Sequence, residues 1–277
     1  HDAVSSTNTE ARKKILDGKE LKLGAMGSGS DYSSFIQHAG IPSLNLGYGG
    51  EDNGGEYHSI YDSYYDFITF KDPGFHYEVA LAQTAGRAVL RMAEANVLPF
   101  DFTHLYNAIA QYSDELQSLL QSTRQSTELE NQIINANYYD VGEDPTKKFI
   151  SPAVKPEVPY LDFSPLQNAL ADLKKSADSL KVVYEEKVKA GAVSADFNQS
   201  LYQAEQQLLS ENGLPRRAWY KHTIYAPGFY TGYGVKTMPG IREAIEQRDW
   251  KEAQEQILVD AKAIAKLADY LKNTESK

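Results

Sequence analysis

Gly27-Ser28-Gly29-Ser30-Asp31 opens the stretch that decides how this sequence folds, and the stretch ends at His58. Apolar residues alternate with polar or small ones over 21–25 and again over 41–48, which is typical of β-strands. A short amphipathic helix lies between them and ends at Gly40, a residue type favoured at helix C-termini. A strand, a helix and a strand of this size close as a right-handed crossover between parallel strands. The stretch therefore predicts an α/β unit.

Two loops of this unit are candidates for ligand binding. The turn Ser28-Gly29-Ser30 and the loop over 49–58 both follow a predicted strand, so they meet at the sheet edge where open α/β sheets bind ligands. The N–H groups and hydroxyls of this turn suit a carboxylate or a peptide backbone. A tight turn with a helix cap explains the same residues without a ligand. The glycine spacing matches neither a phosphate loop nor a dinucleotide fingerprint.

His58 is a candidate metal ligand because it ends a loop with four glycines, which only tertiary contacts or a ligand would hold in place. A lone histidine is more often structural than a ligand. The six histidines show no paired spacing and the chain has no cysteine. If His58 binds a metal, the other ligands are therefore not close to it in the sequence. Asp62 or Asp66 would support a metal-bound His58 by accepting its second N–H. A half-buried wall of tyrosines is the plainer explanation of residues 60–67.

The remainder of the chain is expected to be helical. Leu98-Pro99-Phe100 marks a domain boundary, because proline ends the helix that precedes it. Apolar stripes beyond the boundary predict an all-α bundle, with Ser164 as the N-cap of one helix and Pro165 at its first position. The helices are expected over 9–16, 73–98, 102–120, 164–188, 194–210 and 250–271. Residues 142–165 are expected to form a surface connection, and the aromatic, glycine-rich segment 216–238 to cover another surface.

The composition excludes two classes of partner. The 277 residues include 28 basic and 38 acidic ones, a net charge of -10, so nucleic acid and anionic membranes are not expected partners. No apolar run approaches the ~20 residues of a membrane span. The chain starts with His1 rather than methionine, and we expect it to continue a longer gene product.

Several motifs in one order resemble the glutamate carboxypeptidase II family, which includes the N-acetylated alpha-linked acidic dipeptidases and the transferrin receptor. The motifs are Gly27–Asp31 with Phe35, Gly40-Ile41-Pro42, Tyr57-His58-Ser59 with Tyr61 and Tyr64, Val97–Asp101, Gly213–Arg216, Tyr220–His222, Ile224–Pro227 and Pro239–Ile241. The resemblance covers only the carboxyl-terminal half of the family. It implies an α/β fold followed by an all-α one: residues 1–100 as the end of a zinc-exopeptidase α/β domain, and residues 101–277 as a transferrin receptor-like helical dimerisation domain.

The resemblance also implies roles for individual residues. His58 matches a zinc ligand, and Tyr57 matches a residue that hydrogen-bonds the substrate carbonyl or the tetrahedral intermediate. Ser28, Gly29 and Ser30 would line the substrate groove, and Tyr233 matches a tyrosine that contacts the substrate's terminal carboxylate. The other ligands of the family's two zinc ions and its general-base glutamate lie upstream of the matching part. This chain alone is therefore expected to be inactive, and the missing amino-terminal half is an expected partner.

The resemblance further implies a homodimer that acts on peptides in the periplasm or outside the cell. Glutamate-selective members place a lysine before the tyrosine that matches Tyr233 and arginines in the strand after Gly-Ile, whereas this sequence has Gly232, Asn45 and Gly47 there. No Lys or Arg occurs from Leu23 to Phe70, which predicts an aminopeptidase-like or broad exopeptidase that disfavours acidic residues. Two alternatives remain open. Lys236 could fold into the pocket and restore specificity for acidic residues, or the protein could be a non-catalytic binding protein of transferrin receptor type. A purely helical adaptor does not explain the predicted α/β unit.

Overall fold

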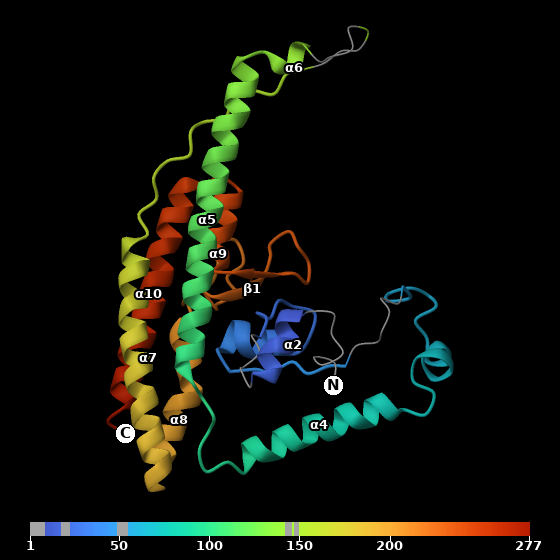
Figure 1. The fold of residues 1–277 in the computed structure, drawn as a ribbon, viewed down its shortest axis with the longest axis vertical. Helices are drawn as coiled ribbons and strands as arrows, with labels where there is room; N and C mark the ends of the chain where they lie inside the picture. Colours follow the sequence, from blue (N-terminus) through green and yellow to red (C-terminus); the bar gives the residue numbers. More distant parts are fainter. Residues whose placement is uncertain (1–8, 18–22, 49–54, 142–145, 147–149) are drawn as a thin grey trace.

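A computed structural model describes residues 9–17, 23–48, 55–141, 146 and 150–277. Three long helices dominate it: α5 (Phe102–Asn135), α7 (Ser164–Ala190) and α10 (Trp250–Thr274). Helix α7 packs against both α5 and α10, and the three run lengthwise beside one another (Figure 1). Among the described residues no helix combines the length and the apolarity that crossing a bilayer requires.

Shorter elements complete the bundle. Helix α8 (Ala195–Gln203) continues into the 3₁₀ segment η3 (Ala204–Leu208), and α9 (Pro239–Glu246) packs on α10. The strands β1 (Tyr225–Pro227) and β2 (Val235–Thr237) form an antiparallel hairpin in which Ala226 pairs with Lys236. The sequence predicted neither α9 nor this hairpin, which lies in the segment expected to be irregular.

The core of the molecule lies between the long helices. Each long helix carries fully buried apolar residues seven positions apart: Ile109 and Leu116 on α5, Leu166, Leu173 and Leu180 on α7, and Ile257, Ile264 and Leu271 on α10. A spacing of seven keeps one stripe facing a neighbour when helices cross at a shallow angle. The predicted bundle of amphipathic helices is therefore present, and its stripes form the core.

The ends of the helices are fixed by side chains that accept N–H groups. Asp101 accepts from Thr103 N at 2.9 Å, and Ser194 accepts from Phe197 N at 3.0 Å. The predicted cap Ser164 is instead the first helical residue of α7, because Asp162 accepts its N–H at 2.9 Å. Helix α5 also runs well beyond the predicted end at residue 120.

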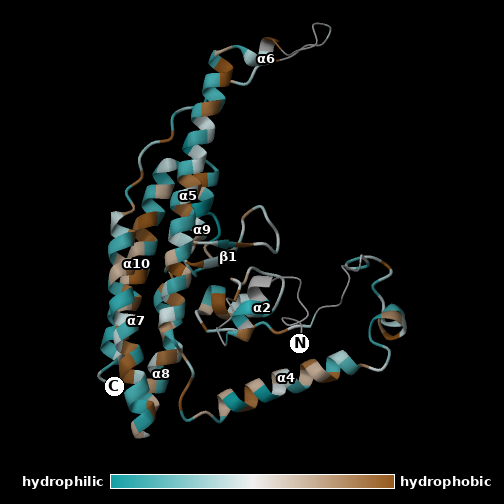
Figure 2. Cartoon of the chain, viewed as in Figure 1, coloured by the Kyte–Doolittle hydropathy of each residue, from teal (hydrophilic) through white to brown (hydrophobic). Residues whose placement is uncertain are grey.

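The part of the chain before residue 100 is less compact. It contains α2 (Thr9–Leu16), the π-helical segment η1 (Ser33–Ala39), α3 (Tyr64–Asp66), η2 (Phe67–Lys71) and α4 (His76–Ala93), while α6 (Tyr138–Val141) follows α5. Helix α4 stands apart from the bundle, and hydrophobic residues recur along it although none is buried (Figure 2). The small and apolar residues of this helix favour packing against a sheet, but no such packing is observed among the described residues.

The predicted parallel crossover is only partly present. The helix between the two predicted strands exists as η1, and Gly40 follows it in the left-handed conformation with φ 64°. The described residues 23–27 and 41–48 form no strand, and residues 21, 22 and 49–54 lie outside the described part. Extended segments become strands only when a neighbour completes their hydrogen-bond ladder. The segments 23–27 and 41–48 have no such neighbour among the described residues, so the α/β class is not established by this structure.

Candidate functional site

The turn that begins at Gly27 lies against the loop that carries Tyr233. Ser28 N donates to Tyr233 O at 3.2 Å, and Ser28 Oγ donates to Gly232 O at 3.3 Å. A Cβ atom at Gly27 would lie 2.2 Å from Tyr233 O, and one at Gly29 would lie 2.8 Å from the Tyr233 ring. Only glycine permits this approach, so the two glycines of the turn are explained by the contact with Tyr233.

Tyr57 and His58 lie beside the same loop. Their rings stack with centroids 3.8 Å apart, and His58 adopts the left-handed conformation with φ 63°. Partial desolvation raises the pKa of Tyr57, and the neighbouring Tyr233 phenol raises it further through its charge and a hydrogen bond. We call Ser28, Gly29, Tyr57, His58 and Tyr233 the tyrosine cluster, since three segments far apart in the sequence bring these residues together.

Ser30 is the predicted site residue that has a structural role outside this cluster. Its carbonyl accepts from Ser33 N at 3.2 Å, at the start of η1, and its side chain is exposed. This arrangement is the turn and helix start that the sequence also allowed. Ser30 therefore borders the cluster rather than contacting the Tyr233 loop.

The carboxylates expected to support His58 lie around Lys71 instead. Lys71 Nζ forms an ion pair with Glu56 and lies 3.9 Å from Asp62 and 3.7 Å from Asp66. The hydrogen bond from Lys71 lowers the pKa of Glu56, and the same bond raises the pKa of Lys71. Lys71 was not singled out from the sequence. It is the first basic residue after the span 23–70, which contains no Lys or Arg. One cation thus offsets part of the negative field near the cluster.

His58 alone cannot form a zinc site, because catalytic zinc takes three protein ligands. Within the described ranges no three His, Asp or Glu side chains are grouped closely enough to hold a metal ion. The described residues therefore do not form a complete metal centre by themselves.

Gln37 connects the Gly27 turn to the helical region. Its side chain is fully buried, and its Nε2 donates to Met26 O at 3.2 Å and also to Gly27 O. Its backbone oxygen accepts from Lys221 N at 2.8 Å and His222 N at 3.0 Å. Nothing in the sequence distinguished this glutamine, since its partners are distant carbonyl and amide groups.

A buried histidine lies next to this connection. His222 is fully buried, and its Nδ1 accepts from Ile224 N at 3.1 Å and Tyr225 N at 3.3 Å. Two donors on Nδ1 require that the ring proton sits on Nε2, which donates to Glu205 Oε1 at 2.9 Å. Burial raises the pKa of Tyr225, and the charge of Glu205 raises it further.

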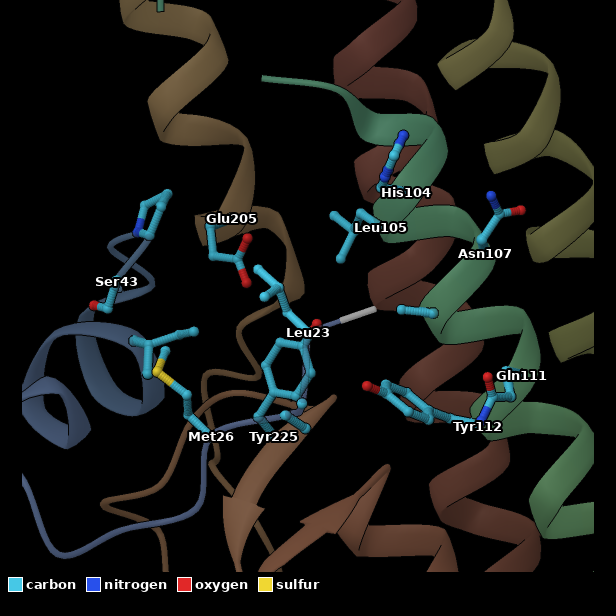
Figure 3. A pocket seen from close by; sticks show the side chains of 15 residues that line it. Leu23, Met26, Ser43, His104, Leu105, Asn107, Gln111, Tyr112, Glu205 and Tyr225 are labelled. Atoms are coloured by element: carbon cyan, nitrogen blue, oxygen red, sulfur yellow. The ribbon is translucent and has the colours of Figure 1, made fainter. Parts of the chain in front are cut away.

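A cavity of about 830 Å³ opens between residues 23–26 and α5. Figure 3 shows the side chains of Met26, Glu205 and Tyr225 on one side and Tyr112 on the other. Its lining includes no member of the tyrosine cluster. The cavity therefore lies beside the Glu205–His222 pair and not at the candidate site.

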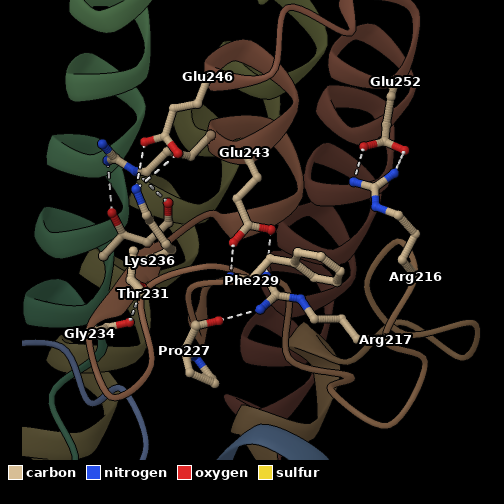
Figure 4. A network of polar contacts seen from close by, with 12 residues as sticks. Arg216, Arg217, Pro227, Phe229, Thr231, Gly234, Lys236, Glu243, Glu246 and Glu252 are labelled. Atoms are coloured by element: carbon tan, nitrogen blue, oxygen red, sulfur yellow. Dashed lines mark hydrogen bonds and ion pairs between the residues drawn. The ribbon is translucent and has the colours of Figure 1, made fainter.

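Lys236 does not reach the tyrosine cluster. Its Nζ binds both oxygens of Glu246 on α9, at 2.7 Å and 2.9 Å (Figure 4). The alternative in which Lys236 folds into the pocket is thus not the arrangement observed.

Comparisons with known proteins agree on one group. The model of the transferrin receptor-like dimerisation domain matches residues 161–272. A probable glutamate carboxypeptidase LAMP1 of Arabidopsis thaliana is 31% identical over 86% of this chain and 30% of its own length. A probable glutamate carboxypeptidase of Arthroderma benhamiae is 32% identical over 85% of this chain and 29% of its own length. The aminopeptidase NAALADL1 of Mus musculus is 27% identical over 91% of this chain and 32% of its own length. The chain thus spans about 30% of the length of these curated relatives.

Proposed function

Because the chain belongs to the transferrin receptor-like glutamate carboxypeptidase family, as its motifs predicted, we propose that it supplies one wall of an exopeptidase substrate groove. The observation that carries the proposal is the tyrosine cluster. The glycine turn holds the Tyr233 loop in place, and the exposed side chains of Tyr57 and Tyr233 lie together from segments that are distant in the sequence, with His58 stacked on Tyr57. Such convergent polar groups suit a peptide end and its scissile carbonyl.

We assign Tyr57 as the donor to the reacting carbonyl. A tyrosine phenol is protonated across the neutral range and the pKa of Tyr57 is raised further, so its hydroxyl can donate to a developing oxyanion. Tyr233 would bind the polar end of the substrate, and Ser28 and Gly29 would hold the Tyr233 loop against the groove. His58 would provide one zinc ligand, with the remaining ligands in the longer protein. A bound zinc ion would polarise the carbonyl and activate water.

The proposed α/β setting explains the exposed apolar residues before the bundle. Leu44 is 63% exposed and Leu46 is 41% exposed, on an extended segment that has no ladder partner among the described residues. Strands contributed by the rest of a protein about three times longer would cover both side chains. Residues 1–100 would then complete the peptidase domain and residues 101–277 would form the dimerisation domain.

The experiment that tests this function compares two variants in the longer protein that carries this chain. Tyr57→Phe should lower kcat about 100-fold with little change in KM, because its hydroxyl acts only in the transition state. Tyr233→Phe should mainly raise KM, since it loses contact with bound substrate. Full activity of both variants would contradict the assignment of the cluster as the substrate groove.

The 277-residue chain by itself should neither hydrolyse peptides nor bind zinc with submicromolar affinity, because it offers one ligand. Calorimetric titration with zinc, beside His58→Ala as control, measures this. A tight site that depends on His58 would show that the missing ligands are present in the chain.

For specificity we propose a broad or aminopeptidase-like enzyme that favours uncharged or basic residues. Gly232 replaces the family's lysine, Lys236 is paired with Glu246, and Lys71 is shared by three carboxylates. No cation near the cluster is then available to a second substrate carboxylate in the described residues. The assay compares arylamides with N-acetyl-aspartyl-glutamate on the full-length protein. A preference for the acidic dipeptide that is lost in Lys71→Ala or Lys236→Ala would refute this specificity.

Two further parts of the proposal depend on the family. The homodimer is supported by the matching dimerisation domain. A location in the periplasm or outside the cell stays a prediction, which fractionation of the native organism tests. A non-catalytic protein of receptor type is the competing proposal, and retention of His58 beside Tyr57 favours the enzyme.

A further inference from the structure

The loop that carries Tyr233 has little apolar anchoring of its own. Residues 228–234 connect two strands of three residues each, and Tyr230 and Tyr233 are both exposed. Inside the loop Gly228 N donates to Gly234 O at 2.8 Å, which closes the loop on itself. This bond fixes the shape of the loop but not its orientation. Another contact must therefore orient the loop relative to the bundle.

That contact is made by Glu243 on α9. Its Oε1 accepts from Phe229 N at 2.7 Å, and its Oε2 accepts from Arg217 Nη2 at 2.6 Å. Arg217 Nη1 donates in turn to Pro227 O (Figure 4). One carboxylate and one guanidinium thus hold the chain on both sides of Gly228, at the base of the loop.

The pair is nearly excluded from water. The side chains of Arg217 and Glu243 are 10% and 9% exposed, and Arg217 lies 5.7 Å from the ring centroids of both Phe229 and Tyr220. Buried ion pairs contribute little net stability, because desolvating two charges costs about as much as their attraction returns. Their geometry is directional, however, and well suited to fixing backbone position.

We infer that Arg217 and Glu243 are positioning residues that set where Tyr233 stands in the substrate groove. The inference rests on the proposed function of Tyr233. Glu243 and Arg217 act through Phe229 N and Pro227 O, and the Ser28–Tyr233 contact secures the other end of the loop. The two contacts together define the place of the Tyr233 phenol beside Tyr57.

The first test measures the loop in the 277-residue chain, without reference to activity. Amide hydrogen exchange of Phe229 and of residues 228–234 should accelerate about 10-fold or more in Glu243→Ala, because the partly buried Phe229 N–H loses its acceptor. Glu243→Gln keeps an acceptor for Phe229 N and should show a smaller increase. Glu252→Ala is the matched control, since it breaks the neighbouring bidentate pair with Arg216 and leaves the loop base intact. Unchanged exchange in Glu243→Ala would overturn the inference.

The second test is a double-mutant cycle in the longer, active protein. Glu243→Ala and Tyr233→Phe should each lower kcat/KM, and their combination should be no worse than the stronger single change, because both remove one interaction. Glu243→Gln should recover part of the loss, which a general loss of stability would not predict. Fully additive effects would overturn the positioning role. No effect of Tyr233→Phe alone would refute the proposed role of Tyr233, while the exchange data would still decide whether the pair holds the loop.

Discussion

Replacing Glu205 should reveal how much the protein depends on the acceptor for His222. The ring is fully buried, its Nδ1 is occupied by two backbone N–H groups, and its Nε2 donates to Glu205 Oε1 at 2.9 Å. A hydrogen bond to a charged acceptor contributes about 1.5–3 kcal/mol, and a buried donor left without a partner costs a similar amount. The size of the effect depends on what replaces the carboxylate.

Three substitutions separate the possibilities. Glu205→Leu covers Nε2 with an apolar side chain of similar length, so the donor is unsatisfied and we expect a loss of about 3 kcal/mol. Glu205→Ala opens Nε2 to the adjacent cavity of about 830 Å³, from which water can reach it, so we expect about 1 kcal/mol. Glu205→Gln retains a carbonyl oxygen as acceptor and should lose less than about 1 kcal/mol.

Urea denaturation of the 277-residue chain at neutral pH, followed by circular dichroism, measures the free energy of unfolding of all three variants. Nitrogen resonances of the His222 ring report separately which nitrogen carries the proton. Equal stability of Glu205→Leu and Glu205→Gln would refute the reasoning, because it would mean that Nε2 does not need this acceptor. A ring protonated on Nδ1 would refute the tautomer on which the expected order rests.

Three other outcomes are expected. Burial raises the pKa of Asp260 well above its ordinary value, so the folded chain retains a proton that the unfolded chain releases. Its stability should therefore fall by up to about 1.4 kcal/mol per pH unit as pH rises from about 4 towards the raised pKa, and Asp260→Asn should lack this slope in urea titrations. Gly27→Ala should accelerate amide exchange at Ser28, because its Cβ would lie 2.2 Å from Tyr233 O, whereas Gly24→Ala meets nothing within 4 Å and is the control. Residues 101–277 should support a homodimer, and a monomer in sedimentation at micromolar concentration would contradict this expectation.

The helices could be predicted because the apolar residues of each buried face recur at helical spacing within one segment of the sequence. The stripe that ends at Leu271 predicted a helix over 250–271, and α10 spans Trp250–Thr274. The prediction for α5 stopped at residue 120, where the apolar stripe gives way to polar residues. Beyond residue 120 the helix contacts the proline-rich segment, where Asn131 binds both Lys155 N and Lys155 O, and the local pattern does not reveal this partner. The predicted strands needed ladder partners, and alternation alone cannot supply them.

The candidate site was predictable only where residue type and family motif coincide. Tyr57, His58 and Ser28 were identified in this way, and the structure places Ser28 and Tyr57 at the Tyr233 loop, with His58 stacked on Tyr57. Gln37 and Lys71 were not, since neither belongs to a motif and the groups that they contact come together only on folding. Sequence reasoning therefore named the candidate groups, whose functional roles stay a prediction, and missed the residues that contact them.

The Tyr233 loop lies within the 112 positions, 161–272, that match a domain described by its role in pairing subunits, and yet it contacts the turn at Ser28. On the proposed function, the region that matches an assembly domain would also build part of the place where a substrate binds. A truncated product that ended before residue 225 would then lose the proposed groove wall and the proposed means of pairing together. Substitutions in residues 225–237 would, on the same proposal, alter substrate preference without any change in residues 1–100.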